Sequence, residues 1–392
     1  MSSQSGLNWF SVSVLCAGLV AALCAPVAGG ESLPSVQVRP YNGRPTVFVG
    51  DTPVALPSYS PISWSKGAFE RQMPGFYPHR MGVYFIMPPR PGGNGYWATQ
   101  FWKGDTVSDT PLADAGPGQL ESLDAMAQAI IANDPNAYIM IRFGIDPPSD
   151  WLAAHRDELF IPEDATAART EYLNTPSFAS DAYWGKAAEF CAALVRHVEG
   201  RPWANRVLGY ANFYACEGCH LPLIDGWLID HNPRMQEAFR AHLVAKYGTL
   251  EALRAAYRDE KATPESIALP REVLRASTPE ASRSLYWQAG PAHQAFRDYM
   301  ECRQALFHKR LIQVTQATRG AAGRDVLIMY DAIKQTMMGW NNPGFFNKGV
   351  SWNPYFPDLY LGTGSSGTAP LFQTPGFSGL ITPHDYQARG IG

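Results

Sequence analysis

Short apolar segments alternate with amphipathic helical patterns along most of this chain. Residues 81–87 (MGVYFIM), 137–145 (AYIMIRFGI) and 207–214 (VLGYANFY) are almost uninterrupted apolar runs. Between them, residues 120–133 and 181–198 carry apolar side chains at helical spacing. Strands that are apolar on both faces are typical of a parallel sheet that helices cover on both sides. The alternation therefore predicts an α/β fold built on a parallel sheet.

Further segments continue the alternation toward the end of the chain. They are helical patterns at residues 235–247, 250–257 and 293–318, and strand patterns at residues 325–330, 359–361 and 379–382. Polar residues gather where the strands end, as they do in a (β/α)8 TIM barrel, whose loops at the carboxyl ends of the strands carry the chemistry. A doubly wound sheet is the alternative, but no Gly-x-Gly-x-x-Gly motif follows the first strand. The sequence therefore favours the (β/α)8 barrel.

The first residues of the chain are typical of a secretory leader. Residues 11–28 form an apolar run that ends in small residues, although no Lys or Arg precedes it. We predict a signal peptide over residues 1–28 and export to the periplasm or the extracellular space, with a membrane anchor as the alternative. Residues 29–62 are predicted to form a β-hairpin element and lead-in, because apolar residues alternate around an Asn-Gly turn. Residues 63–392 are assigned to the barrel.

The charge and cysteine content of the chain restrict its partners. The formal net charge is −3, 17% of the residues are charged, and Lys and Arg form no stripe, so we expect no nucleic-acid partner. Once a leader is removed, the remaining cysteines are Cys191, Cys216, Cys219 and Cys302. An even count in an exported chain permits disulfides without requiring them. We expect no cofactor, no resident metal and no stable membrane partner.

The segment Cys-Glu-Gly-Cys-His at residues 216–220 has three chemical interpretations. It matches the attachment motif of a c-type haem, but Pro222 and turn residues follow it where haem attachment needs a helix. Cys216 and Cys219 could instead form a disulfide or half of a zinc site, although no further ligands stand at a standard zinc spacing. In the third interpretation Glu217, at the carboxyl end of a barrel strand, is a general acid.

Several blocks of the sequence resemble glycoside hydrolase family 42, a family of β-galactosidases. Residues 123–124 (LD) and 142–159 (RFGIDPPSDWLAAHRDEL) resemble its Leu-Asp helix, the strand that follows, and a Pro-Pro-x-Trp-Leu motif. Residues 235–257 (MQEAFRAHLVAKYGTLEALRAAY) resemble its two helices joined by Lys-Tyr-Gly-Thr. Residues 382–390 (TPHDYQARG) are similar to a Ser-Pro-x-x-Tyr-x-x-Arg-Gly block in relatives of the family.

The resemblance implies a (β/α)8 barrel that hydrolyses the O-glycosyl bond of a β-linked sugar by a retaining, two-carboxylate mechanism. In that family the fourth strand ends in Asn-Glu, and the Glu is the acid/base. Glu217 falls at this place, whereas Cys216 stands where the Asn is expected. The family's nucleophile is a second Glu after the seventh strand, which we expect to lie beyond Gly392. On this basis we expect a barrel whose last βα units are missing, and the resemblance also allows a homo-oligomer.

Further residues are candidate contacts to a carbohydrate substrate. They are Arg142, Trp151, Tyr214, Asp331, Asp385 and Tyr386. Arg142 interrupts an apolar strand and needs a partner, for which Glu217 is a candidate. Trp151 could stack on a sugar ring or pack the mouth of the barrel. Asp331 could contact the substrate or cap the helical segment that follows it.

Two other functional classes stay open at this point. One is a degenerate, non-catalytic carbohydrate-binding barrel, which Cys216 and the missing nucleophile suggest. The other is a haem or redox protein that uses Cys216, Cys219 and His220.

Overall fold

A parallel six-stranded sheet organises the fold. The computed structural model describes residues 32–55, 58–59, 71–86, 97–113, 120–163, 175–213, 229–270, 291–331 and 373–381. The strands of the parallel sheet are β4 (Ser58–Tyr59), β5 (Val83–Ile86), β8 (Tyr138–Gly144), β9 (Val207–Phe213), β10 (Leu327–Asp331) and β11 (Gly379–Ile381). They are hydrogen-bonded in the order β4-β5-β8-β9-β10-β11. Every pair is parallel.

The order of the strands in the sheet is also their order along the chain. A doubly wound sheet would reverse direction at a switch point, and the described strands show no such reversal. Winding in one direction is the pattern of a (β/α) barrel. Among the described residues, no pairing between β11 and β4 closes the sheet. The sheet already begins at Ser58, inside the segment assigned from sequence to the lead-in.

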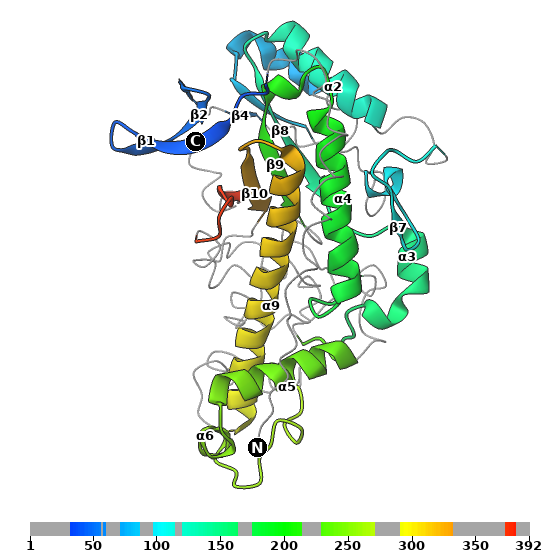
Figure 1. Ribbon diagram of the computed structural model, residues 1–392, viewed down its shortest axis with the longest axis vertical. Coiled ribbons are helices and arrows are strands. Elements are labelled where there is room, and N and C mark those ends of the chain that lie inside the picture. The colour runs from blue at the N-terminus through cyan, green and yellow to red at the C-terminus, as the bar shows by residue number, and fades with distance from the viewer. Residues whose placement is uncertain are drawn as a thin grey trace, which may run out of the picture. The chain divides into compact units, whose positions relative to one another are not determined.

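Long helices pack against this sheet. Figure 1 shows α4 and α9 running side by side along it, with α5 and α6 near one end of α9. The helices are α2 (Leu120–Asn133), α3 (Ser149–Ala154), α4 (Asp181–Glu199), α5 (Pro233–Tyr247), α6 (Leu250–Tyr257) and α9 (Pro291–Ala322). Short 3-10 helices are η1 (Met73–Gly75), η2 (Tyr77–His79), η3 (Ala98–Gln100), η4 (Arg156–Glu158) and η5 (Ala204–Arg206). The predicted helices and strands are confirmed to within a few residues, except that residues 359–361 lie outside the described residues.

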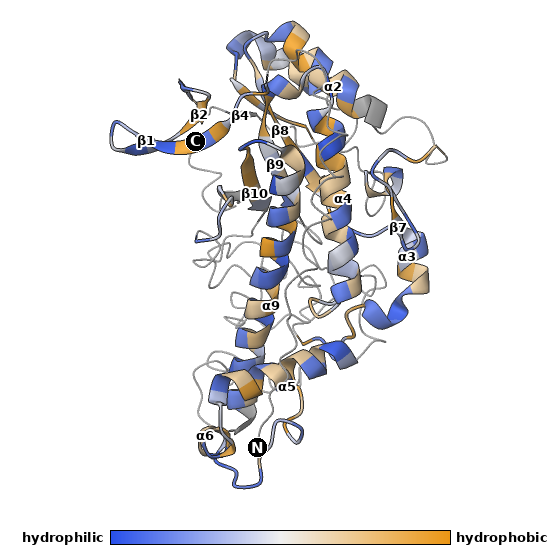
Figure 2. Ribbon diagram, viewed as in Figure 1, coloured by the Kyte–Doolittle hydropathy of each residue, from blue (hydrophilic) through white to orange (hydrophobic). Residues whose placement is uncertain are grey.

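The two faces of the sheet have different partners. Ile141, Phe143 and Tyr210 pack toward the helices, where they share a buried core with Phe190 and Leu194 of α4. Figure 2 shows that α4 and α9 carry both apolar and polar residues along their length. This amphipathic pattern is the one that the helical spacing predicted.

The opposite face of the sheet packs against an N-terminal hairpin. Val83, Met140, Leu208 and Leu327 form a second cluster with Val36 and Val47. The hairpin consists of β1 (Val36–Tyr41), β2 (Arg44–Val49) and β3 (Thr52–Val54), which pair antiparallel in sequence. Its first turn has positive φ at Asn42 (51°) and Gly43 (75°), the backbone of a type I′ turn. A small two-stranded hairpin, β6 (Trp102–Lys103) and β7 (Thr106–Val107), follows η3.

A buried ion pair connects this hairpin to the sheet. Arg324 Nε lies 2.7 Å from Glu199 Oε2, and the two side chains are 7% and 8% exposed. Arg324 also donates to the carbonyl oxygens of Pro34 (2.7 Å) and Val207 (3.0 Å). Tyr210 donates to Glu199 Oε1 at 2.6 Å. The charges are therefore compensated within one network, which a buried pair requires.

Gly209 allows β9 and β10 to approach each other. The two strands pair at Gly209 and Leu327, and β9 is irregular here, because its pairing with β8 shifts between Ile139 and Met140. A Cβ atom on Gly209 would lie 1.9 Å from the carbonyl oxygen of Leu327. No rotation of a side chain can relieve a contact with backbone, so only glycine fits this position.

Gly209→Ala is expected to destabilise the protein by about 3 kcal/mol or more, because β9 and β10 must separate to admit the methyl group. The free energy of unfolding in urea measures the effect. Gly185→Ala in α4 is the matched control, because a Cβ there meets nothing within 4 Å. It should leave stability unchanged or raise it slightly, since alanine favours helix. Equal stability of the two variants would contradict the proposed contact.

Candidate active site

The carboxyl ends of four neighbouring strands meet at one edge of the sheet. Gly144 of β8 pairs with Phe213 of β9, and Tyr330 of β10 pairs with Asn212. Asp331, the last residue of β10, pairs with Ile381 of β11. Chemistry in parallel α/β folds is carried by the segments that follow such an edge. The segment after β9 contains Glu217.

The structure describes only part of the predicted site. Arg142 and Trp151 are described with their side chains, and Asp331 is placed as the end of β10. The remaining predicted residues lie outside the described residues. They are Tyr214, Cys216, Glu217, Cys219, His220, Asp385 and Tyr386.

Arg142 lies two residues before the end of β8, on the face of the sheet opposite the helices, which we call the inner face. Side chains alternate along a strand, and its neighbours Ile141 and Phe143 belong to the core on the helix side. Arg142 is paired in register with Ala211 and is partly exposed. A permanently charged guanidinium is thus held beside the edge where the strands end. Its contact with a substrate stays a prediction.

Trp151 belongs to a buried aromatic cluster. Its side chain is 1% exposed and stacks on His155, with ring centroids 4.6 Å apart. The ring centroids of Trp102 and Tyr183 each lie 5.8 Å from that of Trp151. The observed contacts are those of the packing alternative, so Trp151 supports the β8–α3 connection in this structure. A direct contact with substrate stays a prediction.

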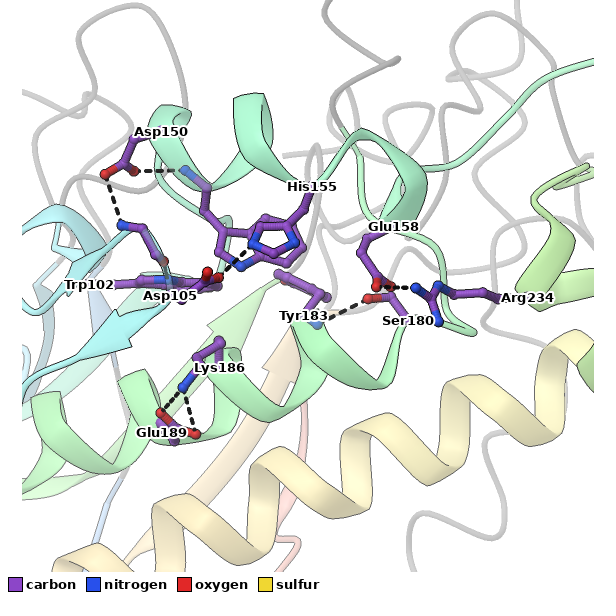
Figure 3. Close-up of polar contacts among 12 residues, drawn as sticks. Trp102, Asp105, Asp150, His155, Glu158, Ser180, Tyr183, Lys186, Glu189 and Arg234 are labelled. Carbon is purple, nitrogen blue, oxygen red and sulfur yellow. Dashed lines mark hydrogen bonds and ion pairs between the residues drawn. The ribbon is translucent and has the colours of Figure 1, made fainter.

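Polar contacts that were not predicted from the sequence hold the β6–β7 hairpin against α3. The Gly104 amide donates to Asp150 Oδ2 at 2.9 Å. His155 Nε2 and Asp105 Oδ1 are 2.5 Å apart (Figure 3). The paired residues are 46 and 50 positions apart in the chain. A local sequence pattern therefore cannot predict these contacts.

Three connecting segments are joined beyond the carboxyl edge. We call residues 157–161, 175–180 and 230–232 the three-segment clasp. The Phe160 amide donates to the Thr175 carbonyl at 2.8 Å, and the Ser177 amide donates to the Glu158 carbonyl at 2.9 Å. The His231 amide donates to the Ile161 carbonyl at 2.7 Å. Backbone bonds therefore fix the three segments to one another.

Asp230 is the buried carboxylate of the clasp. It is 4% exposed, and its Oδ1 accepts from the backbone amides of Ile161 and Asn232, each at 3.0 Å. Burial raises the pKa of Asp230 to about 6, and hydrogen bonds from Ser177, Ile161 and Asn232 oppose part of that rise. Arg303 on α9 also favours the ionised form. The pKa of this carboxyl thus lies well above that of an exposed aspartate.

Asn232 of the clasp and Arg234 of α5 add further contacts. Asn232 is fully buried and donates through Nδ2 to the carbonyls of Asp157 (2.7 Å) and Leu159 (2.8 Å). Its Oδ1 accepts from the Arg234 amide at 2.9 Å, which caps α5. Arg234 Nη2 lies 2.6 Å from Glu158 Oε1 (Figure 3). The start of α5 is therefore fixed to the segment that follows β8.

A second buried carboxylate explains the Lys-Tyr-Gly-Thr block between α5 and α6. Asp298 of α9 is fully buried and accepts from Lys246 Nζ at 2.8 Å and from Tyr247 at 2.9 Å. Tyr257 of α6 donates to it at 2.7 Å, and Gln294 donates at 2.8 Å. The block thus serves helix packing, a role that its sequence alone did not reveal.

The Leu-Asp block of α2 has a comparable role. Arg201 Nε donates to Asp124 Oδ1 at 2.9 Å, and Trp203 Nε1 donates to the same atom at 2.8 Å. Leu123 is fully buried in the core. The pair therefore fastens α2 to the segment that leads into β9.

Both cysteines among the described residues lie in long helices. Cys191 and Cys302 are buried free thiols. Within the ranges that the structure describes, no cluster of three or more His, Cys, Asp or Glu side chains could hold a metal ion. No helix among those same residues is long and apolar enough to cross a membrane.

Comparison with known proteins gives distant likenesses. No protein-family model matches the chain, and no curated protein matches it. The β-galactosidase from the psychrophilic Marinomonas ef1 is similar at 17% identity and a TM-score of 0.45, over 72% of this chain and 38% of that chain. The catalytic domain of β-amylase from Paenibacillus polymyxa is similar at 13% identity and a TM-score of 0.48, over 70% and 67%.

A third solved structure is a catalytic mutant of Gan42B, a GH42 β-galactosidase from G. stearothermophilus. It shares 16% identity at a TM-score of 0.43, over 71% of this chain and 35% of that chain. The chain therefore spans less than two fifths of the length of the two β-galactosidases.

Asp230→Asn is expected to change how stability depends on pH. The native carboxyl keeps its proton up to a pH of about 6, whereas the unfolded chain releases it near 4, so wild-type stability falls as pH rises through this interval. The shift corresponds to about 3 kcal/mol. The asparagine variant has no such proton to lose, so its free energy of unfolding should fall less over the same interval. Parallel pH profiles of urea unfolding for the two proteins would contradict the shift.

Asp298→Ala is expected to lower the free energy of unfolding by about 3–5 kcal/mol, because it leaves Lys246 and two tyrosine hydroxyls without their common acceptor. Thermal unfolding measures the loss. Glu265→Ala, at an exposed glutamate after α6, is the control and should stay within about 0.5 kcal/mol of wild type. Equal losses in the two variants would show that Asp298 is not a packing centre.

Proposed function

We propose that the protein is an exported glycoside hydrolase with a (β/α)8 barrel, acting on a β-linked sugar by a retaining mechanism. The observation that carries the proposal is the sheet wound in one direction, whose strands β8 to β11 end together at one edge. Glu217 follows β9 at that edge, Asp331 ends β10, and Arg142 lies on the inner face of β8. The roles proposed for these residues come from the resemblance to glycoside hydrolase family 42.

In this proposal Glu217 is the acid/base. It protonates the departing glycosidic oxygen, and it later takes a proton from the water that releases the sugar. A second carboxylate, about 5–5.5 Å away in retaining enzymes, attacks the anomeric carbon. Arg142 and Asp331 are proposed to contact the sugar or the carboxylates, as are Tyr214, Asp385 and Tyr386. Trp151 is proposed to hold the segment after β8 in place next to the substrate, through its packing against Trp102 and His155.

A degenerate carbohydrate-binding barrel is the second candidate. It is favoured by Cys216, which stands where the resembling family has an Asn. Binding of a sugar without turnover by the product of the full reading frame would support this candidate. A c-type haem is the third candidate, and a Soret band in protein expressed with export would identify it.

Glu217→Gln is expected to reduce hydrolysis of an aryl β-galactoside by about 100-fold to 10,000-fold, the usual contribution of a general acid/base. The rate of turnover by the full-length protein is measured as the release of the phenolate. Glu237→Gln, at an exposed glutamate of α5, is the matched control and should retain full activity. Undiminished activity of the Glu217 variant would reject the assignment.

A further inference from the structure

The clasp joins two connections that lie beyond the carboxyl edge of the sheet. Residues 157–161 and 175–180 lie between β8 and α4, and residues 230–232 lie between β9 and α5. A backbone hydrogen bond links the two connections, from the His231 amide to the Ile161 carbonyl at 2.7 Å. Further links pass through the side chain of Asp230, which is 4% exposed. The charge on this one carboxyl therefore bears on how firmly the two connections are joined.

Neutral groups donate the hydrogen bonds to this carboxylate. The backbone amides of Ile161 and Asn232 each lie 3.0 Å from Asp230 Oδ1. The Ser177 hydroxyl donates as well, and its oxygen accepts from the Ala179 amide at 3.1 Å. Neutral donors stabilise a negative charge less than a directly bonded cation does. The ionised form of Asp230 is thus held without a strong hydrogen bond of that kind from these groups.

Two side chains of α9 face Asp230. Arg303 is 3% exposed, and its charge favours the ionised form of Asp230. Tyr299 is fully buried, and its hydroxyl oxygen accepts from the Asp230 amide at 2.7 Å. Burial raises the pKa of Tyr299 well above its usual value, so this hydroxyl stays neutral at physiological pH.

The clasp contains other titratable side chains besides Asp230. Asp157 and Glu158 both pair with Arg234, at 3.1 Å and 2.6 Å. His231 directly follows Asp230 in the chain. Each of these groups could also respond to pH, so each needs a control variant of its own.

Protonation of Asp230 removes its charge and leaves its main hydrogen bonds in place. A protonated carboxyl keeps acceptor capacity, so Oδ1 can still accept from Ile161 and Asn232 while the other oxygen carries the proton. The ionised form retains a buried charge, which the loss of hydration disfavours. Burial accordingly raises the pKa of Asp230 to about 6. The closed clasp is therefore more stable with this proton than without it.

We propose that the clasp is a pH-sensitive switch: it joins the two connections most firmly when the Asp230 carboxyl is protonated, and it loosens when that carboxyl ionises. Opening returns the carboxyl to water, where an aspartate has a pKa of about 4. Between about pH 4 and pH 6 the closed clasp keeps a proton that the open clasp has lost, so its stability falls as the pH rises through this interval. The proposal concerns the mobility of the two connections and holds whatever reaction the protein catalyses.

Hydrogen–deuterium exchange at pH 5 and pH 7, corrected for the intrinsic exchange rate, tests the switch. Protection of peptides covering residues 157–161 and 175–180 should fall about tenfold between the two pH values, the ratio that pKa values of about 6 when closed and about 4 when open give. Asp230→Asn keeps an acceptor oxygen and has no proton to lose, so its protection should be equal at the two pH values. Equal falls in wild type and in this variant would overturn the proposal, as would constant protection in wild type.

The other titratable groups of the clasp supply the controls. Asp157→Asn, Glu158→Gln and His231→Gln should each keep the tenfold fall, even where the substitution lowers protection at both pH values. Loss of the pH response in one of these variants would assign the switch to that group instead of Asp230.

Two further measurements complete the test. At pH 7 the clasp amides should exchange faster than those of β9, because the clasp opens without global unfolding, and exchange in step with β9 would contradict a local switch. If Asp230→Asn does not fold, Ser177→Ala takes its place. This variant removes a donor to the ionised carboxylate, so protection should drop more at pH 7 than at pH 5. Equal drops at the two pH values would overturn the proposal.

Discussion

The ion pair between Arg324 and Glu199 is the interaction through which the separate parts of the fold are held together. Arg324 stands just before β10, and Glu199 ends α4. From there the guanidinium reaches the N-terminal hairpin through Pro34 and the start of β9 through Val207, while Tyr210 binds the carboxylate from within β9. The starts of β9 and β10 and the N-terminal hairpin are thus held together by one network.

The packing of neighbouring parallel strands determines which residues meet at their carboxyl ends. Gly209 lets β9 lie close against β10, so Asn212 and Tyr330, near the carboxyl ends of the two strands, lie side by side. Beyond the edge, the three-segment clasp fixes the connections among themselves. The described residues on either side of the 214–228 segment are thus held by hydrogen bonds to other parts of the chain. Preorganisation of this kind is what general acid catalysis requires of a scaffold.

The sequence predicted those parts of the fold that are encoded locally. The apolar runs of β8 and β9 and the helical spacing of α2 and α4 were visible because burial repeats at the period of the element. The Asn-Gly turn of the hairpin was visible because only a few residues accept positive φ.

The polar centres could not be predicted, because they depend on distant partners. Asp230 looks in the sequence like an ordinary carboxylate before a helix, and Asp298 looks like an ordinary polar position within one. Each is nevertheless buried by segments that fold against it from far along the chain. Arg142 was singled out only because it interrupts an apolar strand, and its inner-face position followed from alternation. Glu217 and the cysteines around it rest on sequence and resemblance, since they lie outside the described residues.

The configuration of the first sugar released from an aryl β-glycoside tests the central claim most directly. A retaining enzyme passes through a covalent intermediate and releases the β-anomer before mutarotation. Proton NMR during the first minutes of hydrolysis by the full reading-frame product should therefore show the β-anomeric signal alone. Initial release of the α-anomer would contradict a retaining mechanism with Glu217 as acid/base, and binding without any release would contradict catalysis itself.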